Sequence, residues 1–164
     1  MSWLRTTLVL VAVPVFNNWL LAIFAFFISP DDFTNSALNC YLTMFLACAG
    51  VATSVLGFLN RDVGPARAFL AIVLQGAALL LIFAGIYRGF GLQYGGEHQS
   101  LLSDWQSPLY FSIITWTTVG YGDFSPPAAI RMIAATQALL GYLVLGTSVG
   151  LGTYLLCRND LSDR

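Results

Sequence analysis

The stretch TTVGYGDFSPP, residues 117–127, decides the fold, because it is polar and broken by glycines while the chain on either side of it is strongly apolar. Residues 66–89 come before it and residues 128–157 follow it. Each run is long enough to cross a bilayer, since a spanning helix needs about 20 mostly apolar residues. A glycine-rich segment with little side-chain bulk therefore lies between two helices that belong in lipid.

The composition of the whole chain is that of a membrane protein. Of its 164 residues, 57% are hydrophobic and 9% are charged, and the mean hydropathy is +0.75, a balance that a soluble domain of this size does not need. Apolar windows long enough to span lie at 6–28, 36–59, 66–89 and 128–157. The connections at 29–35 and 60–65 are too short to fold alone, so we expect neither an enzyme nor a ligand-sensing domain.

The basic residues predict the orientation of the spans. The chain has no lysine, and its arginines fall into two groups on opposite sides of the predicted membrane. Arg88 and Arg131 lie on one side, and the other group is Arg5, Arg61, Arg67, Arg158 and Arg164. Because short cytoplasmic loops are rich in basic residues, both termini and the turn at 60–65 are expected in the cytoplasm. The expected location is the plasma (inner) membrane.

The first window has two possible interpretations, since a basic start followed by an apolar run also marks a secretory signal. Its apolar stretch exceeds the usual signal core of about 15 residues, which favours a retained helix. Asn17 and Asn18 interrupt this window and are expected to face another helix, because an amide exposed to lipid is unfavourable. The three cysteines lack the spacing of a disulfide framework and are interpreted as small apolar filler.

The residues before the opening stretch predict a helix too short to cross the membrane. Ser107 and Pro108 combine a capping hydroxyl with the residue best tolerated at the first helical position, so a helix is expected at 108–116. Its apolar part covers about 13 Å at 1.5 Å per residue, which is half a bilayer. Residues 118–121 return a similar distance in extended form, and Ser125 with the two following prolines repeats the cap-and-proline signal before the last helix.

Irregular backbone at membrane depth is tolerated only where protein buries it or where it lines a water-filled cavity. We expect Gly120 and Gly122 to adopt positive φ angles, which glycine does at little cost. Successive carbonyls can then face one axis. The sequence therefore predicts a re-entrant loop whose main-chain oxygens are the functional groups.

Residues 117–123, TTVGYGD, resemble the selectivity filter of potassium channels. The resemblance extends over 66–157, as outer helix, pore helix, filter and inner helix, and does not include the first 60 residues. It implies K⁺ as the permeant ion, no other cofactor, and closure by four copies, which makes the functional unit a homotetramer. By the same resemblance the ion loses its water shell to the Thr118 hydroxyl and to the carbonyl oxygens of Thr118, Val119, Gly120 and Tyr121.

The resemblance also assigns supporting positions, which are Thr117, Gly122, Asp123, Tyr110 and Thr115. Tyr121 is expected to point away from the pore with Thr115 as a candidate partner, and Asp123 is expected near Tyr110. Some relatives place an acidic residue of the pore helix against the filter aspartate, whereas this chain has Ile114 there. No carboxyl pair can form at that point.

The last apolar run contains several glycines, each of which weakens a helix by up to about 1 kcal/mol relative to alanine. Two interpretations stay open. One is a gating hinge, best placed at Gly141, ten residues after Arg131 as in many relatives, with Gly146 as a second position. The other is close packing of small residues at Gly146 and Gly150.

Together these features predict an all-α integral membrane protein with four spans and one re-entrant loop, assembled as a tetramer. Residues 1–60 form a hairpin of two helices outside a pore module at 61–164, and neither helix carries the arginine ladder of a voltage sensor. The predicted function is passive, selective K⁺ conduction across the lipid bilayer, with no nucleic-acid partner. The main alternative is a non-selective or regulatory pore-loop subunit, and a more distant one is a membrane subunit of a potassium uptake transporter.

Overall fold

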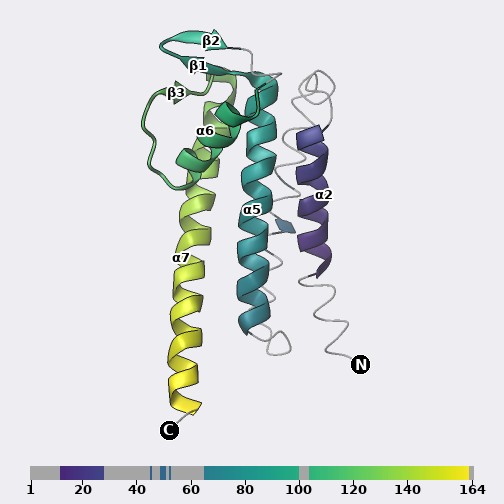
Figure 1. The fold of residues 1–164 in the computed structure, drawn as a ribbon, viewed down its shortest axis with the longest axis vertical. Coiled ribbons are helices and arrows are strands. Elements are labelled where there is room, and N and C mark those ends of the chain that lie inside the picture. Colours follow the sequence, from purple (N-terminus) through teal and green to yellow (C-terminus); the bar gives the residue numbers. More distant parts are fainter. Residues whose placement is uncertain are drawn as a thin grey trace.

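The structure, a computed structural model, describes residues 12–27, 45, 49–50, 52, 65–99 and 104–162. Its elements follow one another as α2, α5, β1, β2, α6, β3, η2 and α7 (Figure 1). The loop predicted at 29–35 and nearly all of the span predicted at 36–59 lie outside the described residues, as do Arg5, Arg61 and Arg164. The N-terminal hairpin at 1–60 therefore stays a prediction.

Two of the described helices have the length and composition to cross a membrane. They contain the spans Ala66–Phe90, of 25 residues, and Ala128–Cys157, of 30 residues. The first span lies in α5 (Pro65–Phe90), and the second comprises η2 (Ala128–Ile130) and most of α7 (Arg131–Ser162). α5 ends before Gly91, whose φ of 73° is the left-handed conformation that commonly follows a helix C-terminus. The last two spans expected from hydropathy are thus helices.

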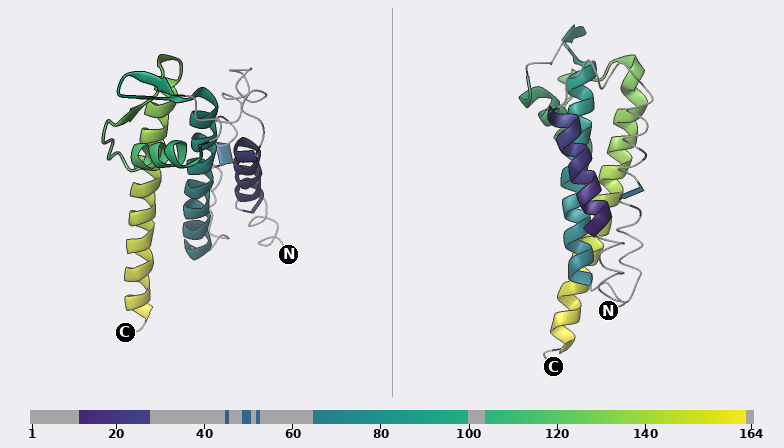
Figure 2. Two further views of the ribbon diagram at one scale, coloured as in Figure 1. Left: turned by 45° about the horizontal axis from the view of Figure 1, so that its top comes forward. Right: turned by 90° about the vertical axis from the view of Figure 1, so that its right-hand side faces the viewer.

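α2 (Val13–Phe27) packs along α5 and runs in the same direction (Figures 1 and 2). Asn18 is fully buried between them, and its amide donates a hydrogen bond to Gln75 Oε1 at 2.5 Å. Gln75 Nε2 in turn donates to the backbone oxygen of Gly50 at 3.1 Å. The prediction that Asn18 faces another helix is confirmed. Paired amides stabilise this contact, because a polar group without a partner is costly in apolar surroundings.

A small antiparallel sheet covers the end of the molecule where α5 ends and α7 begins (Figures 1 and 2). β1 (Leu92–Tyr94) pairs with β2 (Glu97–Gln99) and, on its other edge, with β3 (Phe124–Ser125). Gly95 and Gly96 form the turn with φ angles of 59° and 89°, as a two-residue hairpin requires. This hairpin was not predicted, although a Gly-Gly pair between two short strands is a hairpin signal.

The sheet also corrects the expected start of the last helix. Ser125 lies in β3 opposite Gln93 and does not cap a helix. The residue before η2 is Pro127, which provides no side-chain hydrogen bond to the helix. The helix therefore begins without the predicted serine cap, and Ser125 instead connects the preceding loop to the sheet.

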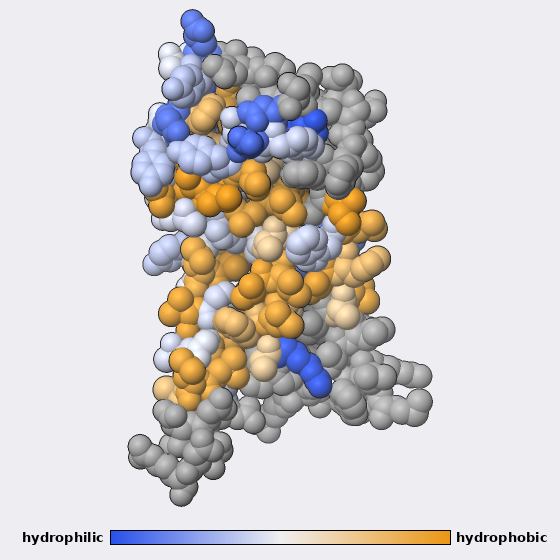
Figure 3. Space-filling model, viewed as in Figure 1, coloured by the Kyte–Doolittle hydropathy of each residue, from blue (hydrophilic) through white to orange (hydrophobic). Residues whose placement is uncertain are grey.

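The apolar core lies where α5, α6 and α7 meet, and α7 contributes only one of its faces. In the apolar window of the α7 span 28% of residues are buried, compared with 61% in the α5 span. The large apolar side chains exposed on α7 include Met132, Leu139, Tyr142, Leu143, Val149 and Leu156. The surface shows an apolar band across the helices, with polar residues towards the sheet (Figure 3). One chain thus leaves most of α7 uncovered by protein.

Candidate functional site

α6 (Gln106–Trp116) is the short helix that leads into the loop at 117–123. Its 11 residues reach about 16 Å, or half a bilayer. The Asp104 carboxylate accepts hydrogen bonds from the Gln106 N–H at 2.8 Å and from the Ser107 hydroxyl. The predicted Ser107 cap is wrong. The helix begins at Gln106, two residues before the expected position, because Asp104 supplies the oxygen that satisfies its first N–H group.

The start of α6 is also attached to the end of α5. The Arg88 guanidinium lies 3.6 Å from the centre of the Trp105 ring, a cation–π contact. The hydrogen bonds from the Ser107 side chain and the Gln106 backbone lower the pKa of Asp104, because they favour the charged carboxylate. A negative charge at this end also complements the helix dipole.

The loop at 117–123 has an alternating backbone. The φ angles of Thr118, Gly120 and Gly122 are 57°, 49° and 81°, while Val119 and Tyr121 between them do not have positive φ. The positive φ predicted for both glycines is confirmed. Thr118 was not predicted, because a β-branched residue in the left-handed region costs about 1–2 kcal/mol. A change of handedness at every second residue allows carbonyls, which alternate in a regular strand, to face one side.

The N–H groups at the start of the loop turn back to α6. Thr117 donates to Ile113 O at 3.0 Å, Thr118 to Thr115 O at 3.1 Å, and Val119 and Gly120 to Ile114 O at 2.9 and 3.2 Å. Among the described residues, no hydrogen bond uses the carbonyl oxygens of Thr118, Val119, Gly120 or Tyr121. The N–H groups at 117–120 are thus hydrogen-bonded, whereas the carbonyl oxygens at 118–121 have no partner among the described residues.

The far end of the loop is anchored by aromatic residues. The Tyr110 hydroxyl donates to the Asp123 carboxylate at 2.8 Å, so the expected contact between these two residues is confirmed. The Phe124 ring lies between two tyrosines, with its centre 5.2 Å from that of Tyr94 and 6.1 Å from that of Tyr110. The loop is therefore held at its start by α6 backbone and at its end by the sheet and Tyr110.

The expected pairing of Tyr121 with Thr115 does not occur within one chain. No hydrogen bond joins them among the described residues, and Tyr121 exposes 73% of its surface. Val119 exposes 52%. The physical reason is that the loop stands at the side of a single chain, where these side chains have few neighbours. The Ile114 side chain, which stands where some relatives have an acidic residue, is buried in the apolar core.

A buried polar network behind the loop was missed by the sequence analysis. The Tyr87 hydroxyl donates to Gln137 Oε1 at 2.5 Å, and Gln137 Nε2 donates to Ser112 Oγ at 2.8 Å and to Ser112 O at 3.0 Å. The Ser112 hydroxyl then donates to Leu80 O at 2.8 Å. These residues come from α5, α6 and α7. The sequence feature that could have predicted the network is Gln137, a glutamine inside an apolar span, where a polar side chain needs a hydrogen-bond partner.

Gly141 brings α7 against the end of α6. A Cβ at this position would lie 2.2 Å from the Trp116 backbone oxygen, whereas one at Gly146 or Gly150 would meet nothing within 4 Å in this chain. α7 is a continuous helix through all three glycines. Gly141 thus has a packing role that the sequence analysis did not assign, and the proposed hinges at Gly141 and Gly146 stay predictions.

Side chains do not form a metal site in the described part of the chain, where no group of three or more His, Cys, Asp or Glu residues could hold a metal ion. The loop offers main-chain oxygens instead.

The comparisons with known proteins agree with this geometry. The family model described as ion channel matches residues 68–156, more than half of the chain. The chain belongs to this ion channel family. Protein LctB of Geobacillus stearothermophilus is 40% identical over 76 residues, which cover 40% of this chain and 55% of LctB, so the chain spans about half the length of this curated relative. No solved structure matches the chain.

The family match has direct structural consequences. It begins in α5 and ends in α7, so the loop at 117–123 lies inside it. The chain is therefore a member of the ion channel family that contains two described helices with the length and composition to cross a membrane.

The contact at Gly141 predicts that Gly141→Ala destabilises the protein. The new methyl group would collide with backbone, which cannot rotate away, and overpacking of this kind costs about 1–3 kcal/mol. Gly146→Ala is the matched control and should be neutral or stabilising, because alanine favours a helix by about 1 kcal/mol. Thermal unfolding in detergent micelles measures both. Equal unfolding temperatures for the two variants would contradict the contact.

The network predicts that Gln137→Leu lowers the free energy of unfolding by about 1–3 kcal/mol, since the buried Tyr87 and Ser112 groups lose their partner. Thr136→Val is the control, because that hydroxyl bonds only to Met132 O of its own helix. Denaturant titration in micelles measures the difference. A Gln137→Leu protein as stable as Thr136→Val would exclude a stabilising role for the network.

The lowered pKa of Asp104 predicts a pH dependence. A depressed pKa in the folded state contributes stability above the ordinary pKa of aspartate, and that contribution disappears as the pH falls through the lowered value. Asp104→Asn should therefore unfold at a lower temperature than the natural protein at pH 7, with the difference shrinking in acid. A difference that stays constant between pH 7 and acid would refute the assignment.

Proposed function

We propose that the protein conducts K⁺ passively and selectively across the membrane, through a pore formed by the loops of four identical chains. The observation that carries this proposal is the backbone at 118–122. Its φ angles alternate in sign, and the N–H groups of 117–120 are hydrogen-bonded to carbonyls of α6. The carbonyl oxygens of Thr118, Val119, Gly120 and Tyr121 therefore stay available to a cation. The family match supports ion conduction, and the loop supports K⁺ as the ion.

Carbonyl oxygens suit a monovalent cation that must enter and leave quickly. They provide partial negative charge that replaces hydration, and conduction needs binding weak enough for release. The Thr118 hydroxyl adds one more oxygen at the inner end of the row. Asp123 follows the row and is engaged by Tyr110, so its carboxylate is assigned a supporting role along with Thr117, Thr115 and Gly122.

One loop cannot surround an ion, so the proposal needs several copies. The uncovered face of α7 and the exposed Val119 and Tyr121 support an assembly, because a neighbouring copy would cover them. In a homotetramer Tyr121 would pack against protein and set the width of the pore. Gly141 and Gly146 are the proposed hinge positions of α7.

The proposed topology has four spans, with the two N-terminal helices outside the pore module. α2 contacts α5 and so lies on the outer helix. The positive-inside rule supports cytoplasmic termini and a multi-pass protein of the plasma (inner) membrane.

Flux through purified protein in liposomes tests the proposal. We expect K⁺ and Rb⁺ to permeate, barium to block, and Na⁺ to be largely excluded. Gly120→Ala should reduce the preference for K⁺ over Na⁺, because alanine at φ 49° is strained by about 1–2 kcal/mol. Thr136→Val is the control outside the loop, since that hydroxyl bonds only to Met132 O of its own helix.

Two outcomes would count against this function. Equal permeation of Na⁺ and K⁺ would favour the non-selective alternative. Absence of flux from a correctly assembled tetramer would favour the regulatory subunit.

A further inference from the structure

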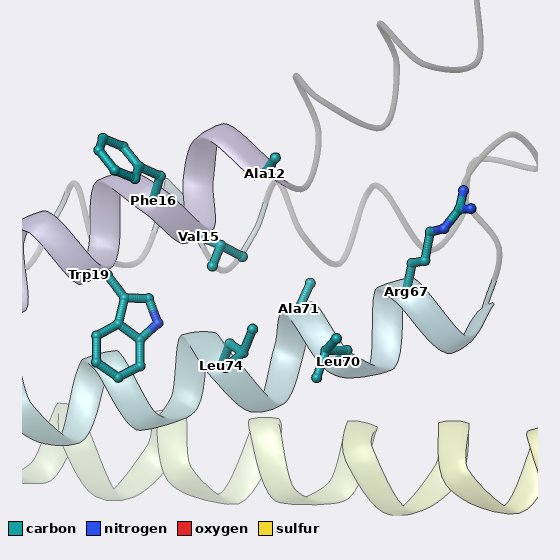
Figure 4. A pocket seen from close by; sticks show the side chains of 8 residues that line it. All are labelled: Ala12, Val15, Phe16, Trp19, Arg67, Leu70, Ala71 and Leu74. Carbon is teal, nitrogen blue, oxygen red and sulfur yellow. The ribbon is translucent and has the colours of Figure 1, made fainter.

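A groove lies between α2 and α5, along the first half of each helix (Figure 4). Its volume is about 510 Å³, which is in the range of ligand-binding sites. α2 contributes Val15, Phe16 and Trp19, and α5 contributes Arg67, Leu70 and Leu74. Phe16 exposes 71% and Leu70 58% of their surface, so the groove opens to the surroundings of the protein, which in a membrane are lipid.

The charge in this groove is confined to one end. Arg67 carries the only charge among the lining residues and belongs to the first turn of α5, where the span Ala66–Phe90 begins. At that depth a guanidinium meets lipid head groups. Leu74 lies about 10 Å further along the helix, at the depth of acyl chains. The groove therefore matches the layered chemistry of a phospholipid.

We propose that this groove binds an anionic phospholipid, with the phosphate on Arg67 and an acyl chain between the apolar residues of α2 and α5. A guanidinium has five N–H donors in a fork that fits phosphate oxygens, so it can donate to a phosphate while it keeps contacts within the protein. Neither α2 nor α5 contains an acidic residue, so neither helix repels a negatively charged lipid. The proposal requires a membrane location only, and is independent of K⁺ selectivity.

Lipid titration of the full-length protein tests the head group. Delipidated protein is titrated with phosphatidylglycerol and with phosphatidylcholine of the same chains, and bound lipid is counted by native mass spectrometry. Phosphatidylglycerol should bind about fivefold more tightly, and Arg67→Gln should remove most of that preference, since one basic residue contributes about that factor at an anionic surface. Arg67→Lys should be intermediate, because it keeps the charge and loses the fork. Arg131→Gln, an exposed arginine outside the groove, is the control.

A second variant tests the acyl-chain site. Ala12 also lines the groove and is exposed. Ala12→Phe should therefore narrow the groove and weaken binding of both lipids at least fivefold. This test stands even where Arg67→Gln does not fold. Equal affinities for the two lipids, or binding unaffected by Ala12→Phe, would overturn the proposal. If a second copy of the chain occupies the groove instead, the natural protein should bind both lipids equally, and Ala12→Phe should change the oligomeric state. Ion flux on the same samples reports the proposed function separately.

Discussion

Backbone groups inside a bilayer have no water to satisfy them, and each unpaired N–H or C=O there costs several kcal/mol. α6 ends at Trp116, and its last carbonyls would be such groups, because no further helical turn follows. The N–H groups at 117–120 remove that cost by donating to the carbonyls at 113–115. These same bonds use the N–H groups of the first four loop residues, while the carbonyl oxygens of Thr118, Val119, Gly120 and Tyr121 keep no partner among the described residues. The loop therefore requires water or a cation in front of it.

The position of those oxygens depends on where α6 ends, and polar contacts in an apolar core determine that position. Gln137 is fully buried and joins Tyr87 of α5 to Ser112 of α6. Such networks specify an arrangement because a displaced member would leave buried groups unpaired. At the opposite end of α6, Asp104 and the Arg88–Trp105 contact fix its first turn. The helix that presents the loop is thus held at both ends and from the side.

Hydropathy and glycine chemistry predicted much of this, and contacts distant in sequence account for the rest. The last two apolar runs, at 66–89 and 128–157, and the positive φ of Gly120 and Gly122 are local properties, and they are confirmed. Thr118 could not be foreseen, because its left-handed conformation is imposed by the amide bonds to α6 against its own preference. The choice of Asp104 over Ser107 as the cap, the hairpin at Gly95, and the partners of Gln137 all depend on three-dimensional neighbours.

The contact at Gly141 bears on how the proposed hinge would act. Trp116 O lies where the Cβ of any other residue at 141 would be, so α7 touches α6 at the point where the loop begins. A bend of α7 at Gly141 would therefore change the separation between α7 and Trp116, and through the bonds at 117–120 it would disturb the row of oxygens. A bend at Gly146, which meets nothing within 4 Å in this chain, would move the second half of α7 and leave the loop in place. As hinges, the two glycines would therefore differ: a bend at Gly141 would be coupled to the loop, and a bend at Gly146 would be confined to the second half of α7.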